Sequence, residues 1–96
     1  MTAYVIANIR VHDPDGMRAY SQAVTPVVEK FGGRYLVRGG AHNILEGSPD
    51  FSRVVIIEFP SVEAVHAWWD SAEYADAKKL RQKVAQTDMI VVAGLP

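Results

Sequence analysis

The chain contains no cysteine among its 96 residues. This absence excludes disulfide bonds, thiolate metal sites and thiol nucleophiles, and it leaves the redox compartment open. An excess of charge of one sign is also missing, because ten lysine and arginine residues are interspersed with eleven aspartate and glutamate residues. A nucleic-acid partner would require a basic patch, so we expect no such partner.

Long apolar segments are absent as well. Residues 1–10 are apolar for too short a stretch to act as a signal peptide or to span a membrane. We therefore expect a cytoplasmic protein with no membrane partner.

Metal and nucleotide sites lack their usual sequence patterns. The three histidines, His12, His42 and His66, do not have the close spacing of a metal-binding pair. The glycine pairs at 32–33 and 39–40 match no phosphate-binding loop. We expect a protein that works without metal, nucleotide or flavin cofactors.

What is present is the composition of one globular domain spanning residues 1–96, with 49% hydrophobic and 22% charged residues. Alternating or consecutive apolar residues predict strands at 3–11, 34–38, 44–46, 53–59 and 89–93. Apolar residues at helical spacing predict three helices, with Asp13, Ser61 and Asp70 as the residues that cap their N-termini.

This order of elements predicts an α+β protein of the ferredoxin-like class, a split β-α-β arrangement in which an antiparallel sheet has its helices on one face. The apolar runs at 54–57 and 89–93 place side chains on both faces of their strands. One domain of this size has too few elements to cover both faces. A second copy, packed sheet against sheet, would cover the other face, so we expect a homodimer.

Polar residues on otherwise apolar surfaces are the candidate functional residues. Tyr20 lies in the apolar stripe of the first helix, and Tyr74 and Arg81 lie seven residues apart on one face of the third. Glu58 shares a strand face with apolar residues of 53–59, and Arg38 ends its strand on the side of Leu36.

Two interpretations of these residues remain open. In the structural one, they form hydroxyl hydrogen bonds and an ion pair, with Glu58 buried against an arginine, that join helix to sheet or subunit to subunit. In the functional one, Tyr20, Arg38, Trp69, Tyr74 and Arg81 line a cleft for a small, flat, carboxylated molecule. Glu58 and Tyr74 would then be the candidate catalytic acid–base pair.

Several blocks of the sequence resemble one known family. They are Gly32-Gly33-Arg34-Tyr35-Leu36-Val37-Arg38-Gly39-Gly40, the block from Arg53 to Ser61, Trp69-Asp70-Ser71-Ala72-Glu73-Tyr74, then Arg81 and Val92-Ala93-Gly94. Their spacing over essentially the whole chain is similar to that of the domain of unknown function 1330. The resemblance implies a dimeric α+β barrel and assigns no reaction.

These observations indicate a class of ligand but do not identify a specific reaction. We expect binding or transformation of a small organic molecule. An enzyme of this kind would be a cofactor-independent oxygenase or isomerase, by analogy with similar dimeric barrels. The alternative is a non-catalytic ligand-binding or structural accessory protein.

Overall fold

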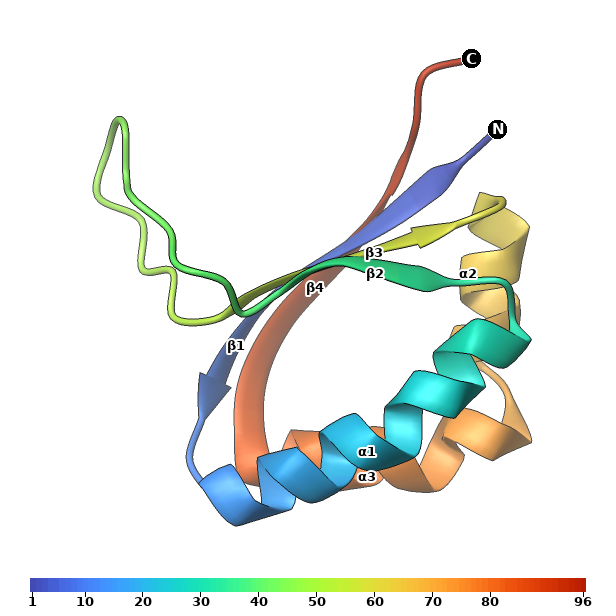
Figure 1. The fold of residues 1–96 in the computed structure, drawn as a ribbon, viewed down its shortest axis with the longest axis horizontal. Coiled ribbons are helices and arrows are strands. Elements are labelled where there is room, and N and C mark those ends of the chain that lie inside the picture. The colour runs from blue at the N-terminus through green and yellow to red at the C-terminus, as the bar shows by residue number, and fades with distance from the viewer.

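A computed structural model describes all residues from Met1 to Pro96. The elements are four strands and three helices, in the order β1 (Ala3–Val11), α1 (Pro14–Lys30), β2 (Arg34–Arg38), β3 (Val54–Phe59), α2 (Val62–Trp69), α3 (Ala72–Val84) and β4 (Ala85–Ala93). The ferredoxin-like fold predicted from the sequence is confirmed, with α2 and α3 forming its second helical crossover (Figure 1).

The sheet has the strand order β2-β3-β1-β4, and all of its neighbours are antiparallel. β1 pairs with β4 along its whole length, from Ala3 opposite Ala93 to Val11 opposite Ala85. The three helices lie on one face of the sheet, where α1 and α3 run side by side (Figure 1). We call this the helix face and the other the open face.

Local sequence signals determine where the helices begin. The Asp13 carboxylate accepts a hydrogen bond from the Gly16 amide, and Pro14 takes the first helical position, where its missing N–H costs nothing. The hydroxyl of Ser61 accepts from the amide of Ala64 at the start of α2. These two predicted caps are confirmed.

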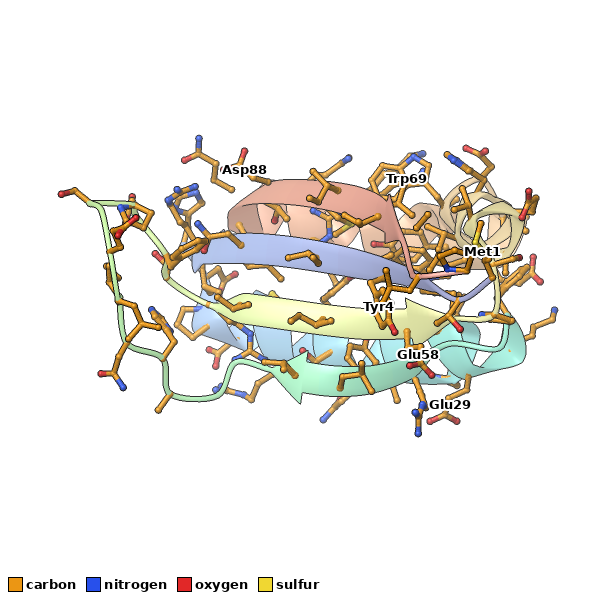
Figure 2. The ribbon with its side chains drawn as sticks, turned by 90° about the horizontal axis from the view of Figure 1, so that it is seen from above. Met1, Tyr4, Glu29, Glu58, Trp69 and Asp88 are labelled. Carbon is orange, nitrogen blue, oxygen red and sulfur yellow. The ribbon has the colours of Figure 1, made fainter.

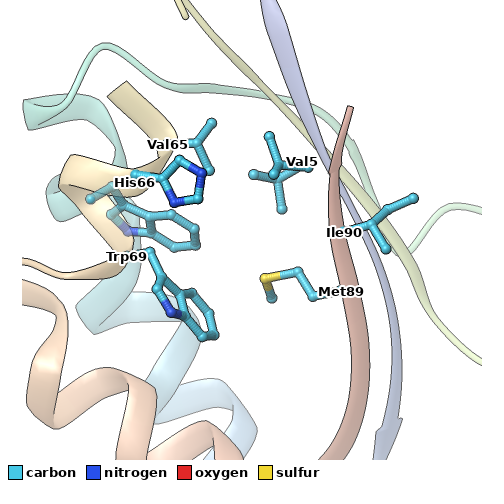
Figure 3. Close-up of a pocket in the computed structure, with 8 residues that line it drawn as sticks. Val5, Val65, His66, Trp69, Met89 and Ile90 are labelled. Atoms are coloured by element: carbon cyan, nitrogen blue, oxygen red, sulfur yellow. The ribbon is translucent and has the colours of Figure 1, made fainter. Parts of the chain in front are cut away.

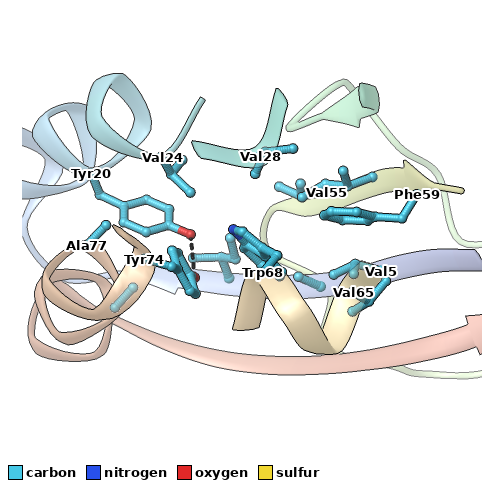
Figure 4. Close-up of a cluster of buried hydrophobic side chains, with 14 of the residues drawn as sticks. Val5, Tyr20, Val24, Val28, Val55, Phe59, Val65, Trp68, Tyr74 and Ala77 are labelled. Atoms are coloured by element: carbon cyan, nitrogen blue, oxygen red, sulfur yellow. Dashed lines mark hydrogen bonds between the residues drawn. The ribbon is translucent and has the colours of Figure 1, made fainter. Parts of the chain in front are cut away.

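The core fills the space between the helices and the helix face of the sheet. Its 17 buried apolar or aromatic residues include alternate positions of β1 and the largest fully buried side chains, Trp68, Tyr74 and Phe59. Trp68 packs against Phe59 and Tyr74, with ring centroids 5.5 Å and 4.3 Å away (Figure 4). An aromatic cluster therefore joins α2, α3 and β3.

The open face carries the other residues of the same strands. The pairing register brings Ile6 opposite Ile56 on one side and opposite Ile90 on the other, and it brings Tyr4 opposite Glu58. Figure 2 looks onto this face, where Tyr4 and Glu58 project from neighbouring strands. Ile90 is 58% exposed, so a row of apolar side chains lacks cover within one chain.

The strand expected at 44–46 is wrong. These residues belong to a long excursion between β2 and β3 that projects beyond the sheet (Figure 1). Residues 40–52 are all exposed, and Leu45 is 99% exposed. The apolar residues at 44 and 45 resemble a short strand in sequence, but no neighbouring strand provides hydrogen-bonding partners for them.

Two other boundaries differ from the prediction. Ser71, not Asp70, caps α3 through its hydroxyl, which accepts from the Tyr74 amide, whereas the amide of Asp70 donates to the carbonyl of His66 and so ends α2. The last strand begins at Ala85, four residues before the expected Met89, because its polar first half pairs with the end of β1. The strand expected from Arg53 begins at Val54.

Candidate functional site

Three of the predicted site residues meet in the interior between α1 and α3. Tyr20 comes from α1, and Tyr74 and Arg81 come from α3, where they lie two turns apart on one face. The Tyr20 and Tyr74 hydroxyl oxygens are 2.9 Å apart (Figure 4), and the Arg81 Nε donates to the Tyr74 hydroxyl at 3.4 Å. The Arg81 guanidinium lies 5.8 Å from the centre of the Tyr20 ring and 5.9 Å from that of Trp69. We call Tyr20, Trp69, Tyr74 and Arg81 the Arg81 cluster.

Arg81 is a buried cation with no carboxylate partner. It is 3% exposed and is the one charged residue in the core. The five ion pairs of the structure involve other residues. Burial of a charge is costly unless the charge is paired, so an unpaired guanidinium at this depth is unusual. The cluster therefore favours an anion beside Arg81.

The hydrogen-bonding groups around Arg81 contain more donors than acceptors. One of the two tyrosine hydroxyls donates to the other, which leaves the second hydroxyl hydrogen without an acceptor. The Trp68 indole N–H is buried and has no partner. Figure 4 shows its nitrogen turned toward the side on which the two tyrosine hydroxyls lie. A ligand with a negatively charged oxygen would satisfy this excess.

The pKa shifts in the Arg81 cluster keep Tyr20 neutral and Arg81 positively charged. Burial raises the pKa of Tyr20, and the nearby Tyr74 hydroxyl raises it further. Burial acts to lower the pKa of Arg81, but its interactions with Tyr74 and Tyr20 outweigh this effect and the pKa is raised. At neutral pH the cluster therefore presents a neutral tyrosine hydroxyl and a cationic guanidinium.

An apolar cleft adjoins the cluster on the β4 side. It has a volume of about 160 Å³ and is bounded by Val5, Val65, His66, Trp68, Trp69, Met89, Ile90 and Val91 (Figure 3). We call it the Trp69 cleft. Lys78 lies across Trp69, with its ammonium 4.2 Å from the ring centre and hydrogen-bonded to the Trp69 carbonyl. Trp69 thus forms a wall of the cleft and is also a member of the Arg81 cluster. The other four residues expected to line a cleft, which are Tyr20, Arg38, Tyr74 and Arg81, do not border this one.

A much smaller cavity lies deeper between the sheet and α1. Its volume is about 20 Å³, and Tyr20, Tyr35, Arg38, Arg53 and Trp68 are among its lining residues. Space of this size accommodates about one water molecule. We call it the inner cavity. It shares Val5, Trp68 and Met89 with the Trp69 cleft, so the two hollows are adjacent.

Arg38, an exposed residue, lies on the helix face because of an irregularity in β2. The pairing register shifts between Tyr35 and Val37, so Arg38 lies on the helix face with Tyr35 and not on the side of Leu36, as the simple alternation predicts. Its guanidinium lies 4.1 Å from the centre of the Tyr35 ring and donates to the carbonyl of Ser21 on α1 at 2.9 Å. Arg38 is therefore separate from the Arg81 cluster but adjoins the inner cavity.

Glu58 does not join the site. It projects from the open face, whereas Tyr74 is in the helix layer, so the sheet separates the expected acid–base pair (Figure 2). Glu58 does pair with an arginine, Arg34, at 2.9 Å. The expectation that this pair is buried is wrong within one chain, because the Glu58 side chain is 26% and the Arg34 side chain 71% exposed.

Sequence reasoning missed two residues that bear on the site. Trp68 was passed over beside Trp69, yet it is 1% exposed and has the unpartnered N–H. Its signal was helical spacing, since Trp68 follows Val65 by three residues on the buried side of α2. Arg53, whose Nε is buried without a partner, lies just before β3 and had no periodic signal.

Clusters of metal-binding side chains and membrane-spanning helices are both absent from the structure. No three histidine, aspartate or glutamate side chains come together as a metal site would require. None of the helices has the length and apolar composition that a membrane span needs.

The whole chain is similar in structure to several solved proteins. A protein of unknown function from Rhodopseudomonas palustris is 26% identical, with a TM-score of 0.78 over 99% of this chain and 83% of that one. SnoaB, a cofactor-independent oxygenase from Streptomyces nogalater, is 10% identical, with a TM-score of 0.72 over 99% of this chain and 94% of that one. A dimeric protein of unknown function and ferredoxin-like fold from Bacteroides fragilis is 15% identical, with a TM-score of 0.67 over 95% and 94% of the two chains.

Sequence comparisons agree with the fold. No curated protein sequence matches the chain. The family model of DUF1330, a domain of unknown function, matches residues 2–95, which is nearly the entire chain. The chain therefore belongs to the DUF1330 family.

Proposed function

We propose that this protein binds a small carboxylated organic molecule between its helices and its sheet, with the carboxylate at the Arg81 cluster. The observation that carries the proposal is Arg81 itself, a core guanidinium that is 3% exposed and lacks a carboxylate partner. A bound carboxylate would supply the missing negative charge. It would also accept hydrogen bonds from the unpaired tyrosine hydroxyl and from the Trp68 indole.

The apolar part of the ligand would lie in the Trp69 cleft. Seven of the eight lining residues are hydrophobic, and an apolar cavity of about 150 Å³ is large enough to hold benzene. The volume of about 160 Å³ therefore suits one small ring or an equivalent unsaturated chain. Trp69 and Met89 would contact its flat faces.

We propose binding rather than catalysis for this cluster. Its donors would also stabilise an oxyanion or enolate that forms during a reaction. Proton abstraction would additionally need a base, however, and burial keeps Tyr20 protonated while Glu58 lies on the other face of the sheet. A ligand-binding accessory protein is the form of this function that the geometry supports best.

The working unit that we propose is a homodimer joined through the open face. Its support is the row of apolar residues from Ile56 through Ile6 to Ile90, which one chain leaves uncovered, and the description of several solved structures of this fold as dimeric. A second copy offers the same apolar surface and so covers it by self-complementarity.

The binding proposal is tested by thermal shift with small acids. Benzoate and crotonate are screened against the wild type, Arg81→Met and Tyr74→Phe, with benzamide as the uncharged counterpart of benzoate. A ligand that binds only the folded state at a hundredfold excess over Kd stabilises it by about 2.7 kcal/mol. We expect a shift with an acid and none with benzamide. The shift should disappear in Arg81→Met and weaken in Tyr74→Phe.

Arg34→Met is the matched control, because Arg34 is an exposed arginine on the opposite face of the sheet. It should leave the shift unchanged. Arg81→Met should also leave the unliganded protein at least as stable as the wild type, since it removes an unpaired buried charge and keeps the bulk of the side chain. If no acid binds and Arg81→Met strongly destabilises the fold, Arg81 is a structural residue and the proposal is wrong.

A further inference from the structure

A third hollow opens beside α1 and leads toward the inner cavity. It has a volume of about 310 Å³ and is bounded by Val11, Pro14, Met17, Arg18, Ser21 and Arg53. We call it the α1 mouth. It shares Met17, Ser21 and Arg53 with the inner cavity, so the deep space beside Tyr20 lies next to this mouth as well as to the Trp69 cleft.

Arg53 lies where the α1 mouth and the inner cavity meet, and its Nε is buried without an acceptor. Its guanidinium lies against the backbone of Gly39, a residue with φ of +74°. A Cβ atom at position 39 would come within 2.7 Å of the Arg53 Cζ, so the close approach depends on glycine. The absence of a Cβ at position 39 thus leaves room for the guanidinium, which is the end of a flexible side chain.

Arg38 is the second cation at this position. It lines the inner cavity together with Arg53, and it is oriented by the Tyr35 ring and the Ser21 carbonyl. Neither Arg38 nor Arg53 has a carboxylate within ion-pair distance. Both guanidinium groups act to lower the pKa of the Tyr35 hydroxyl against the larger effect of burial, as two cations near the same group would.

Two groups of donors line the inner cavity. One consists of Tyr20, which is hydrogen-bonded to Tyr74 of the Arg81 cluster, and Trp68 with its unpartnered N–H. The other consists of the exposed Arg38 and the half-buried Arg53. No acidic residue lines the inner cavity or the α1 mouth. A ligand with a single acidic group at the Arg81 cluster would leave these two arginines without a negatively charged partner.

We propose that Arg38 and Arg53 form a second anion subsite, which holds a second acidic group of the molecule whose first acidic group binds at the Arg81 cluster. The inference rests on the proposed function and narrows its ligand to a small organic dianion. Guanidinium groups bind carboxylates and phosphate-like groups equally well in geometry, so the second group is either of these. The inner cavity holds only about one water molecule as it stands, so the flexible side chains of Met17 and Met89, which line it, would have to move to admit a ligand that spans both subsites.

The test compares ligands of one shape and different charge by calorimetry. Terephthalate has two carboxylates, 4-phosphonobenzoate replaces one of them with a phosphonate, and 4-carbamoylbenzoate replaces it with a neutral amide. Fumarate and its monoamide form a shorter pair. We expect at least one dianion to bind about tenfold more tightly than its amide counterpart, the effect of one charge-assisted hydrogen bond. The second acidic group of the natural ligand is identified by which of the two, the carboxylate or the phosphonate, shows the larger gain in affinity over the amide.

Arginine variants show which residues are responsible for the tighter binding of the dianion. Arg53→Met and Arg38→Met should each reduce the ratio of dianion to amide affinity toward one, because the dianion loses more affinity than the neutral amide when a guanidinium is removed. Arg53→Lys should recover part of the ratio because it keeps the charge. Arg34→Met is again the control and should keep the whole ratio, and about 0.5 M salt should reduce it in the wild type because the α1 mouth is open to solvent.

The two proposals fail in different ways. If the amides bind in an Arg81-dependent manner but no dianion binds more tightly, or if the advantage survives both Arg38→Met and Arg53→Met, the second subsite is wrong and the first stands. If no acid of either kind binds, both proposals are wrong.

Discussion

The arginines on the two sides of the sheet differ in their exposure and in whether a carboxylate pairs with them. On the open face, Arg34 is 71% exposed and has a carboxylate partner in Glu58, at a place where water would solvate either charge well. On the helix face, Arg81 is 3% exposed and has none. If electrostatic stability alone determined the sequence, the carboxylate would lie beside Arg81. The proposed binding of an acidic ligand at Arg81 would account for this difference.

The apolar residues of the sheet are mostly buried on the helix face and exposed on the open face. Alternate residues of β1, such as Val5 and Ala7, are buried against the helices, while Ile6 between them is 37% exposed. The helix face buries its apolar side chains, apart from those that border the Trp69 cleft, but leaves Arg81 without a carboxylate partner. The open face pairs Arg34 with Glu58 but leaves its apolar side chains uncovered within one chain. The proposed small anion and the proposed second copy would complete these two surfaces.

The largest effect should follow a charge placed at the centre of the open face. Ile6 lies between Ile56 and Ile90 in the register, so Ile6→Lys would bury an unpaired ammonium between two sheets. We expect a wild-type mass about twice the 10.6 kDa of the chain by light scattering at micromolar concentration, and a monomer for Ile6→Lys. Leu45→Lys, at a position 99% exposed, is the control and should stay dimeric. A monomeric wild type would remove this explanation of the open face.

An intermediate effect is expected from alkaline pH on the helix face. The pKa of Tyr20 is raised from its ordinary value of 10.0, so the folded state holds this proton more tightly than the unfolded chain does. The associated stability is complete below about pH 10 and is lost as the pH rises toward the folded-state pKa, by about 1.4 kcal/mol per pH unit. Urea unfolding at about pH 9 and pH 10.5 should show this loss in the wild type.

The matched variant for this measurement is Tyr20→Phe, which lacks the titrating hydroxyl. Its stability should decline less steeply than that of the wild type over the same pH range, because the other lysines and tyrosines titrate in both proteins. Parallel declines would mean that Tyr20 is not held protonated by the fold.

The smallest effect is expected at the ion pair of the open face. Glu58→Ala removes the carboxylate from an exposed Arg34, which water then solvates, so the free energy of unfolding should fall by no more than about 1 kcal/mol. Chemical denaturation measures this change. A loss of about 3 kcal/mol or more would show that the pair is buried in the working assembly. If the dimer causes this burial, the loss should shrink in the monomeric Ile6→Lys background.

The sequence predicted the parts of this molecule that depend on short-range periodicity. The nine-residue strand β1, the start of α1 at Asp13 and the buried stripe of α3 that includes Tyr74 and Arg81 all follow from spacings within one element. The grouping of Tyr20 with Tyr74 also followed, because two apolar stripes on neighbouring helices must share one core.

The rest depended on relationships between elements that spacing does not encode. Alternation assigns Glu58 to a strand face but does not say which face the helices cover, so its separation from Tyr74 was not predicted. The register shift in β2 reversed the side of Arg38, and one irregular residue in a short strand leaves no periodic signal. The polar first half of β4 was missed because its strand character comes from pairing with β1.

The pairing of β1 with both later strands has a consequence for synthesis. β1 is made first, but its partner β3 begins at residue 54 and its other partner β4 at residue 85. A nascent chain on the ribosome therefore carries an apolar strand with two unpaired edges, and one edge stays open until the last segment emerges. Contacts that join the first and last segments also make folding slow. Chaperone demand and translation speed, more than final stability, should thus set the yield of this small protein in cells.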